Sequence, residues 1–310
     1  MLIVVNPQAG EGRALARWRE IEPKVRERVG PFQTVVTQDP ESVPAVVAQR
    51  LAAGETAFVA AGGDGTVNLL MRSLVEHIDS TDLREIRLGA IGLGSSNDFH
   101  KPIQACGRIE GAPCRLDFAS ATLHDVCLVT FRDEEGARRR RPWLINSSIG
   151  TTAEANHFFN HPSRPLRLLK RLAPGLAIAY AALRTLVRRR SQDLTVTIDG
   201  STELRIQVAN LGVVKNPHFT GSLRYDSPIE PASGHFYVHL LADVSLARLL
   251  LALSRLARGR FSGQRGACSW RAVRVVVRSE RPFALEGDGE VVLAREASFC
   301  VMPRLLRIAA

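Results

Sequence analysis

The chain has 310 residues, of which 45% are hydrophobic and 23% are charged. These values are typical of globular proteins and exclude disordered, collagen-like and disulfide-scaffold proteins, and the length is enough for two hydrophobic cores. The unusual value is the charge, because 41 Lys and Arg against 31 Asp and Glu give a net charge of +10. Such an excess favours a polyanionic partner, which is a nucleic acid, a phosphorylated metabolite or an anionic membrane.

Two segments in the second half of the chain contain this excess. Residues 157–192 and residues 244–279 each hold eight basic residues and no acidic one. Removing these sixteen from the 41 leaves 25 basic residues against 31 acidic ones in the rest of the chain. Both segments have the leucine spacing of basic amphipathic helices, and two such helices in one chain favour an anionic surface as the partner.

The first hundred residues predict a parallel sheet with helices on both faces. Apolar runs at residues 2–5, 33–37, 56–61 and 86–92 alternate with helix-like stretches at 11–29, 41–53 and 66–78. From about residue 115 the chain alternates strand-like runs with turn residues, which predicts a mostly antiparallel β domain. We therefore expect an α/β domain at residues 1–118, a β domain at 119–296, and a C-terminal segment at 297–310 that returns to the first domain.

Neither a membrane-spanning helix nor a secretory signal is expected. The longest uncharged apolar stretch in the middle of the chain, residues 172–183, is far shorter than the roughly 20 residues that a spanning helix needs. The first ten residues, MLIVVNPQAG, lack the basic and long apolar regions of a secretory signal. We expect a cytoplasmic protein that associates with a membrane only peripherally.

The strongest local motif is AAGGDGTVN at residues 60–68, between an apolar strand and a helix. Its three glycines allow the backbone to approach a ligand, and the N–H groups at the start of the helix favour an anion, so the motif predicts a phosphate site. It is neither a GxxxxGK[ST] loop nor a GxGxxG fingerprint. Asp64 would repel a phosphate unless a cation lies between them, which implies Mg²⁺ or an acceptor role in phosphoryl transfer.

Two further polar loops follow predicted strands of the same sheet. The sequence NPQAG at residues 6–10 follows the first strand, and GLGSSNDF at residues 92–99 follows the fourth. Loops at the carboxyl ends of parallel strands converge on one crevice, so residues of all three loops are expected to face one nucleotide. These residues are Asn6, Gly10, Asp64, Ser95, Asn97 and Asp98.

The three loop motifs, together with INSSIG at residues 145–150 and GDGE at residues 287–290, have the order and approximate spacing of a known family. Over nearly its whole length the sequence resembles the diacylglycerol kinase catalytic family, which includes YegS-like bacterial lipid kinases, sphingosine kinases and ceramide kinases. The resemblance implies a phosphofructokinase-like α/β domain that binds ATP, followed by a β-sandwich domain with helical insertions that binds the lipid. It places the active site in the cleft between the two domains.

The resemblance also implies roles for individual residues. Asp288 would be the general base, with Glu290 as a catalytic residue beside it. The residues around the Mg²⁺ of Mg-ATP would be Asp64, Asp98 and Asp117. The residues at ATP would be Asn6, Pro7, Gln8, Ala9, Gly10, Thr37, Gly62, Gly63, Asp64, Gly65, Thr66, Val67, Asn68, Ser95 and Asn97. Ser233 replaces an Asp that helps some relatives to hold a structural Mg²⁺, so we expect no second metal.

We expect a phosphotransferase with an alcohol acceptor, which transfers the γ-phosphate of ATP to the hydroxyl of diacylglycerol or a similar lipid alcohol and so acts in phospholipid metabolism. Such transfer needs a carboxylate to take the hydroxyl proton and Mg²⁺ to neutralise phosphate charge, and Asp288 and Asp64 suit these two roles. The expected partners are therefore the lipid substrate and an anionic membrane surface.

Two alternatives remain open at this point. One is an NAD kinase-like enzyme with a soluble substrate, since NAD kinases share the GGDGT sequence. The other is a non-catalytic lipid-binding relative, which the departures from the family pattern at Leu69 and Ser233 would favour. We expect no nucleic-acid partner, because the basic residues are not interleaved with aromatic ones. The sequence does not distinguish a monomer from a homodimer.

Overall fold

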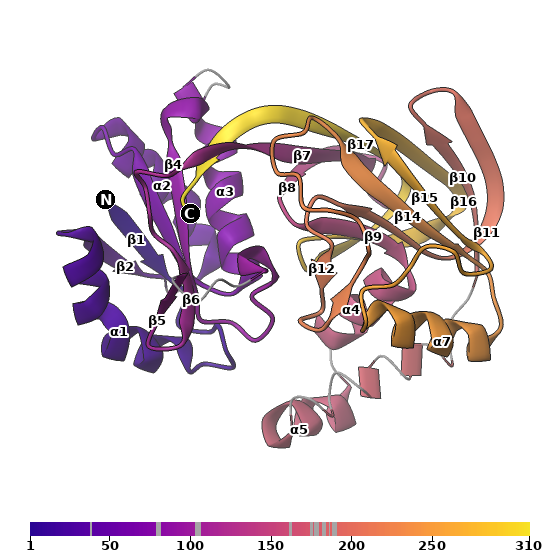
Figure 1. Ribbon diagram of the computed structural model, residues 1–310, viewed down its shortest axis with the longest axis horizontal. Helices are drawn as coiled ribbons and strands as arrows, with labels where there is room; N and C mark the ends of the chain where they lie inside the picture. The colour runs from indigo at the N-terminus through magenta and orange to yellow at the C-terminus, as the bar shows by residue number, and fades with distance from the viewer. Residues whose placement is uncertain are drawn as a thin grey trace.

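The computed structural model describes residues 1–310 apart from residue 38 and residues 79–81, 103–106, 161, 162, 174, 175, 177–179, 182, 183, 186 and 188–190. The described chain forms an α/β domain and a β-rich domain, which two long strands join (Figure 1). Among the helices of this described part, none combines the length and the apolar character needed to span a bilayer.

The first domain is built on a parallel sheet in the order β2-β1-β3-β4. Its strands are β1 (Leu2–Val5), β2 (Gln33–Val36), β3 (Ala57–Gly62) and β4 (Arg87–Gly92), and its helices are α1 (Ala14–Val29), α2 (Val43–Ala52) and α3 (Asp64–His77). Side chains alternate along β1: Leu2 and Val4 pack in the core under α2 and α3, whereas Ile3 and Val5 pack under α1. The predicted sheet with helices on both faces is therefore confirmed.

Short elements complete the first domain. They are the 3-10 turns η1 (Pro40–Ser42), η2 (Asp82–Glu85) and η3 (Asp98–His100) and the strands β5 (Arg108–Ile109) and β6 (Ala112–Arg115). Strand β6 pairs with β4 in antiparallel direction, with Arg115 opposite Ala90. The chain after β6 therefore emerges at the amino end of the parallel strands.

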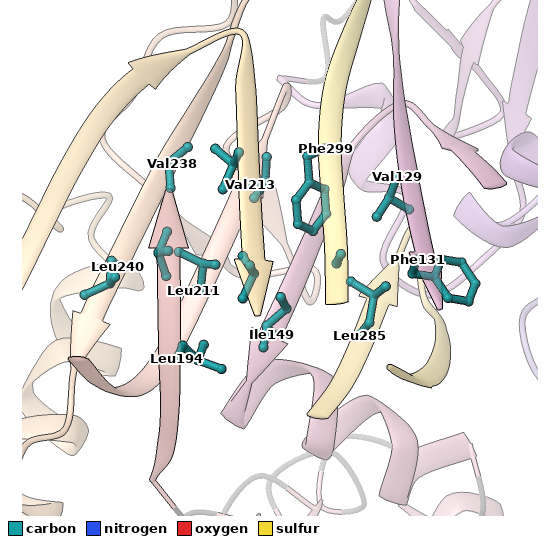
Figure 2. Close-up of a cluster of buried hydrophobic side chains, with 14 of the residues drawn as sticks. Val129, Phe131, Ile149, Leu194, Leu211, Val213, Val238, Leu240, Leu285 and Phe299 are labelled. Atoms are coloured by element: carbon teal, nitrogen blue, oxygen red, sulfur yellow. The ribbon is translucent and has the colours of Figure 1, made fainter. Parts of the chain in front are cut away.

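The second domain is antiparallel, as the sequence predicts. Its strands are β7 (Thr122–Arg132), β8 (Arg138–Trp143), β9 (Asn146–Gly150), β10 (Gln192–Ile198), β11 (Thr202–Val214), β12 (His218–Phe219), β13 (Leu223–Arg224), β14 (Phe236–Ala242), β15 (Ala267–Ala272), β16 (Arg274–Gly287) and β17 (Glu290–Ile308). Strands β9 and β10 each pair with both β11 and β16, at opposite ends of those two strands. The four strands thus surround one hydrophobic core, and Figure 2 shows Ile149, Leu211 and Leu285 among its side chains.

Among the described residues, the second domain has the helices α4 (Thr151–Asn160), α5 (Arg164–Leu172) and α7 (Leu246–Leu256). They occupy the lower edge of this domain in Figure 1. The helix α7 packs on the domain through the buried residues Leu249, Ala252 and Leu256. The first basic segment contains α5, and the part of this segment after residue 173 lies largely outside the described residues.

A two-stranded ribbon of β7 and β17 joins the domains (Figure 1). Residues Arg307 and Ile308, at the end of β17, pair in parallel with Arg87 and Leu88 of β4. Leu306, also on β17, is fully buried in the core of the first domain. The last strand of the chain therefore starts in the second domain and ends as part of the first domain's sheet.

Candidate active site

A cleft of about 420 Å³ lies between the carboxyl edge of the parallel sheet and the second domain. The first domain lines it with Asn6, Ala9, Gly10, Gly63, Asp64, Gly65, Thr66, Gly94, Ser95, Ser96 and Asp98. The second domain lines it with Ile145, Asn146, Thr152, Asn156, Phe219, Thr220, Glu286, Asp288, Gly289 and Glu290. Both domains therefore contribute polar groups to one cavity.

The three loops of the first domain are held together at the cleft. The side-chain amide of Asn6, which follows β1, donates to Oγ1 of Thr66 in α3 at 3.1 Å. The loops after β3 and β4 also lie close together: a Cβ on Gly94 would be 2.5 Å from Cα of Gly63, which is too close for any side chain. Glycine at position 94 therefore permits the contact that brings these two loops together.

Asp64 stands at the first position of α3, where its carboxylate accepts a 2.9 Å hydrogen bond from the backbone N–H of Phe99. Desolvation and the nearby carboxylates of Asp98 and Asp288 raise the pKa of Asp64 to about 6. A cation would relieve this repulsion, so the side chains present fit Mg²⁺ next to Asp64. The described residues contain no group of three or more His, Cys, Asp or Glu placed to hold a metal.

Asp98 is already paired in this structure. It is 6% exposed, and its carboxylate accepts a 2.7 Å hydrogen bond from the ammonium of Lys101 and a 3.2 Å hydrogen bond from the backbone N–H of Gly221. Gly221 belongs to the second domain, so Asp98 links the loop after β4 to the opposite side of the cleft. Its negative charge is largely balanced by Lys101.

Asp288 lies in a two-residue hairpin between β16 and β17. Positive φ values at Asp288 (45°) and Gly289 (91°) are those of the type I′ turn that Asp-Gly favours. The carboxylate of Asp288 is 6% exposed and accepts four hydrogen bonds. The donors are the backbone N–H groups of Leu144, Ile145 and Asn146 and the side-chain amide of Asn68, at 2.7 to 3.0 Å. Burial raises the pKa of Asp288, and these hydrogen bonds oppose that shift.

Two glutamates flank this turn and have different surroundings. Glu286 is 2% exposed, and its carboxylate accepts hydrogen bonds from Ser148 Oγ at 2.7 Å and from the backbone N–H of Gly289 at 2.6 Å. Burial raises the pKa of Glu286 to about 7. Glu290 is half exposed and forms ion pairs with Arg72 at 2.8 Å and Arg141 at 3.6 Å. Of the two, only Glu286 keeps a buried carboxylate at the cleft.

The structure brings many of the predicted site residues to the cleft, but not all. Those that line it are Asn6, Ala9, Gly10, Gly63, Asp64, Gly65, Thr66, Ser95, Asp98, Asp288 and Glu290. Those that do not line it are Pro7, Gln8, Thr37, Gly62, Val67, Asn68, Asn97 and Asp117. Asn68 nevertheless contacts Asp288, and the side chain of Asn97 hydrogen-bonds the backbone of Gly94 and so shapes the loop after β4.

Asp117 is placed far from the expected metal site. It follows β6, which runs antiparallel to β4, so the chain has returned to the opposite edge of the sheet at this point. There Asp117 is exposed and accepts hydrogen bonds from the backbone of Ala119 and Ser120. The structure gives Asp117 no contact with the cleft, and we do not retain it as a metal ligand.

Several cleft residues were not predicted from the sequence. Thr152 and Asn156 come from α4, directly after the INSSIG motif, and Thr220 comes from the loop that also supplies Gly221. Glu286 belongs to the end of β16, whereas Asp288 lies in the turn after it, so the alternation of side chains along a strand does not relate these two carboxylates. No local sequence signal singled out Glu286.

Two sequence models of known domains match the chain. The diacylglycerol kinase catalytic domain matches residues 1–128, and the YegS C-terminal NAD kinase beta sandwich-like domain matches residues 148–310. No curated protein matches the chain. The second match alone spans more than half of the 310 residues.

Solved structures from Bacillus anthracis strain Sterne share the fold. One, described as a diacylglycerol kinase, is 14% identical with a TM-score of 0.69, over 99% of this chain and 95% of its own. Two others, described as candidate diacylglycerol kinases, are 17% and 16% identical with TM-scores of 0.72 and 0.73, over 99% of this chain and 96% of theirs. At these identities the likeness concerns the fold, and the family follows from the two domain matches: the chain belongs to the YegS-like lipid kinase family.

Proposed function

We propose that the protein is an ATP- and Mg²⁺-dependent kinase that phosphorylates the hydroxyl of diacylglycerol or a similar lipid alcohol. The observation that carries this proposal is the shared cleft, in which the glycine-rich loops of the first domain face the Asp288 hairpin of the second. Glycine loops and the start of α3 suit phosphates, and a buried carboxylate across the cleft suits a hydroxyl that must lose a proton. In-line phosphoryl transfer requires this opposition of donor and acceptor sites.

The nucleotide would lie along the loops after β1, β3 and β4, with its phosphates at Gly63, Gly65 and the start of α3. Asp64 would hold the Mg²⁺ that accompanies ATP, and the ion would neutralise charge on the phosphate oxygens. Asp98 would act mainly through its contacts with Lys101 and Gly221, which fix the distance between the two sides of the cleft. Of the three carboxylates first expected around the metal, Asp64 is the one that we propose as a direct ligand.

The proton acceptor that we propose is Asp288. Each of its oxygens already accepts two hydrogen bonds, so one must be released before the carboxylate can accept a proton. Three of the four donors are backbone groups, and the fourth is the side chain of Asn68, which can rotate away. We therefore propose that Asn68 frees Oδ2 of Asp288 when the lipid hydroxyl arrives.

Two single substitutions test this assignment, because Glu286 lines the same cleft. Asp288→Asn should lower kcat about a hundredfold or more while the protein remains folded, since general base catalysis is removed. Glu286→Gln should leave most of kcat. The assay is transfer of labelled phosphate from ATP to diacylglycerol in mixed micelles, with NAD as a parallel acceptor. If Asp288→Asn were fully active and Glu286→Gln inactive, Glu286 would be the general base instead of Asp288. Phosphate transfer to NAD alone would overturn the lipid kinase proposal.

A membrane surface is the partner that we propose for the helical edge of the second domain. Helix α7 exposes Leu250 (46%) and Leu251 (53%), and helix α5 exposes Leu168 (59%) and Leu172 (73%). Arg248 and Arg258, on and just after α7, are also exposed. Exposed leucines interspersed with arginines are typical of helices that lie in an anionic membrane interface. A lipid substrate would be reached from such a surface.

Vesicle sedimentation tests this partner. Replacing Leu250 and Leu251 together by Ser should weaken binding to phosphatidylglycerol-containing vesicles about tenfold or more, since two leucine side chains no longer enter the interface. The matched control replaces Ala247 and Ala257, which are exposed at α7, by Ser and should bind as the wild type does. Binding should also fall with added salt. Equal binding of both variants, or binding to neutral vesicles alone, would overturn the proposed surface.

A further inference from the structure

A buried lysine lies at the junction of the two domains. Lys215 directly follows β11 and is 7% exposed. Its Nζ atom lies at hydrogen-bond distance from four oxygens, which we call the oxygen cage. The cage consists of Asp125 Oδ2 at 2.7 Å, the carbonyl oxygens of Glu230 and His235, each at 2.8 Å, and Ser233 Oγ at 3.2 Å.

The oxygen cage ties together segments that are distant in the sequence. Asp125 comes from β7, and its side chain is 0% exposed. Besides Lys215, its carboxylate accepts the backbone N–H of Gly234 at 2.7 Å and that of Arg304 in β17 at 2.9 Å. The loop at residues 230–235 precedes β14. One ammonium therefore stands at the centre of contacts between β7, β11, β17 and this loop.

The ligands in the cage are those of a hard metal ion. One carboxylate, two backbone carbonyls and a hydroxyl form the kind of all-oxygen set that binds Mg²⁺ or Ca²⁺ in proteins. An ammonium group has three protons to share among these four oxygens and carries one positive charge. The cage has one carboxylate, Asp125, so the charges balance with Lys215 and would not balance with a divalent ion.

We propose that the ammonium of Lys215 is a covalently attached cation that fills the oxygen cage in place of a bound metal. The structural Mg²⁺ expected from some relatives does not fit here, because Lys215 occupies the centre of the cage and position 233 is Ser instead of a second carboxylate. The junction of the two domains is therefore stabilised without metal. The proposal concerns only the oxygen cage and not the Mg²⁺ proposed at Asp64, and it does not depend on the kinase function.

The cage also has a connection to the cleft. The next residue, Asn216, donates from its side-chain amide to the carbonyl oxygens of Asp98 and Lys101, both at 3.1 Å. The position of the loop after β4 thus depends on the position of Lys215. Because the ammonium of Lys215 cannot dissociate, this connection does not depend on the concentration of free metal.

Thermal unfolding of the full-length, nucleotide-free protein tests the proposal. Tm is measured with EDTA and with added divalent ions in the Asp64→Asn variant, so that metal bound in the cleft does not affect the result. For this variant, excess EDTA and millimolar Mg²⁺ or Ca²⁺ should give the same Tm. A Tm that falls with EDTA, or rises saturably with either ion in this variant, would overturn the proposal.

Substitution of the lysine gives the second measurement. Lys215→Met should lower Tm by about 10 °C, because it leaves Asp125 buried without its counter-ion. The matched control is Lys24→Met, which removes the exposed ion pair of Lys24 with Glu110 and should leave Tm unchanged. An equal, small effect of both substitutions would show that the cage does not stabilise the junction, and so would also overturn the proposal.

A third variant converts the cage into a metal site. Replacing Lys215 by Ala and Ser233 by Asp in the Asp64→Asn protein leaves an empty cage with two carboxylates, which a divalent ion balances. Mg²⁺ or Ca²⁺ should raise the Tm of this variant by several degrees, with saturation, while the parent does not respond. If the variant folds and neither ion changes its Tm, the four oxygens are not a cation site and the proposal fails.

Discussion

The pH dependence of stability offers a direct test of the buried carboxylate of Glu286. Its pKa rises from the ordinary 4.5 to about 7 on folding, because burial disfavours the charged form. Between these two values the folded state binds the proton more tightly than the unfolded state, so the contribution of Glu286 to stability falls as pH rises. At about 1.36 kcal/mol per pKa unit, this loss amounts to about 3 kcal/mol and is complete above pH 7.

The substitution Glu286→Gln isolates this contribution. The amide oxygen can still accept from the backbone N–H of Gly289, and the hydroxyl of Ser148 can accept from the new amide, so the contacts are retained without a titrating group. Urea unfolding at intervals from pH 4.5 to pH 8 gives the free energy of unfolding of both proteins. The variant should gain about 3 kcal/mol relative to the wild type over this range.

A difference between the two proteins that does not change with pH would refute this reasoning. Glu27→Gln, on the exposed surface of α1, is the control and should change stability by no more than about 0.5 kcal/mol. A difference that grows in the opposite direction would mean that the carboxylate of Glu286 is stabilised in the folded protein as the charged form.

Three further outcomes are expected. Gly94→Ala should weaken ATP binding, measured by calorimetry, about tenfold or more. The new Cβ would lie 2.5 Å from Cα of Gly63 and push apart the loops after β3 and β4, so an unchanged affinity would contradict this contact. Leu249→Ala should lower the free energy of unfolding in urea by about 3 kcal/mol, because Leu249 is buried. Leu251→Ala, on the exposed side of α7, should lower it by less than about 0.5 kcal/mol, and equal effects would mean that α7 is not packed as described. Asp64→Asn should increase the Mg²⁺ concentration needed for half-maximal kinase activity. It should also raise Tm in metal-free buffer at pH 8, since the neutral side chain avoids the desolvation of a buried carboxylate and its repulsion with Asp98 and Asp288; a lower Tm would contradict the raised pKa.

Much of the first domain could be predicted from the sequence because its signals are local. The apolar runs at residues 2–5, 33–37, 56–61 and 86–92 became β1 to β4 with small shifts at their ends. The parallel direction of these strands then places the loops that follow them at one edge. This is why residues as far apart as Asn6, Asp64 and Ser95 line one cleft, as their order along the sequence predicts.

The parts of the fold and of the site that could not be predicted depend on contacts between segments far apart in the sequence. The sequence analysis predicted neither β6 nor its direction, and the antiparallel pairing of β6 with β4 places Asp117 away from the cleft. The cage around Lys215 combines residues from three separate segments, none of which has a local metal-binding pattern. The Asp-Gly hairpin was an ordinary turn by its local pattern, and only the packing of the second domain against the first places Asp288 beside Asn68.

The ribbon of β7 and β17 makes the completion of both domains depend on the last residues of the chain to be synthesised. Strand β4 is made early, yet its parallel partner at Arg307 and Ile308 is synthesised more than two hundred residues later. Until then, the first domain leaves the apolar surface that Leu306 covers open to water or to chaperones. The two domains therefore cannot mature one after the other on the ribosome, and a chain that stops at residue 300 would leave both domains incomplete.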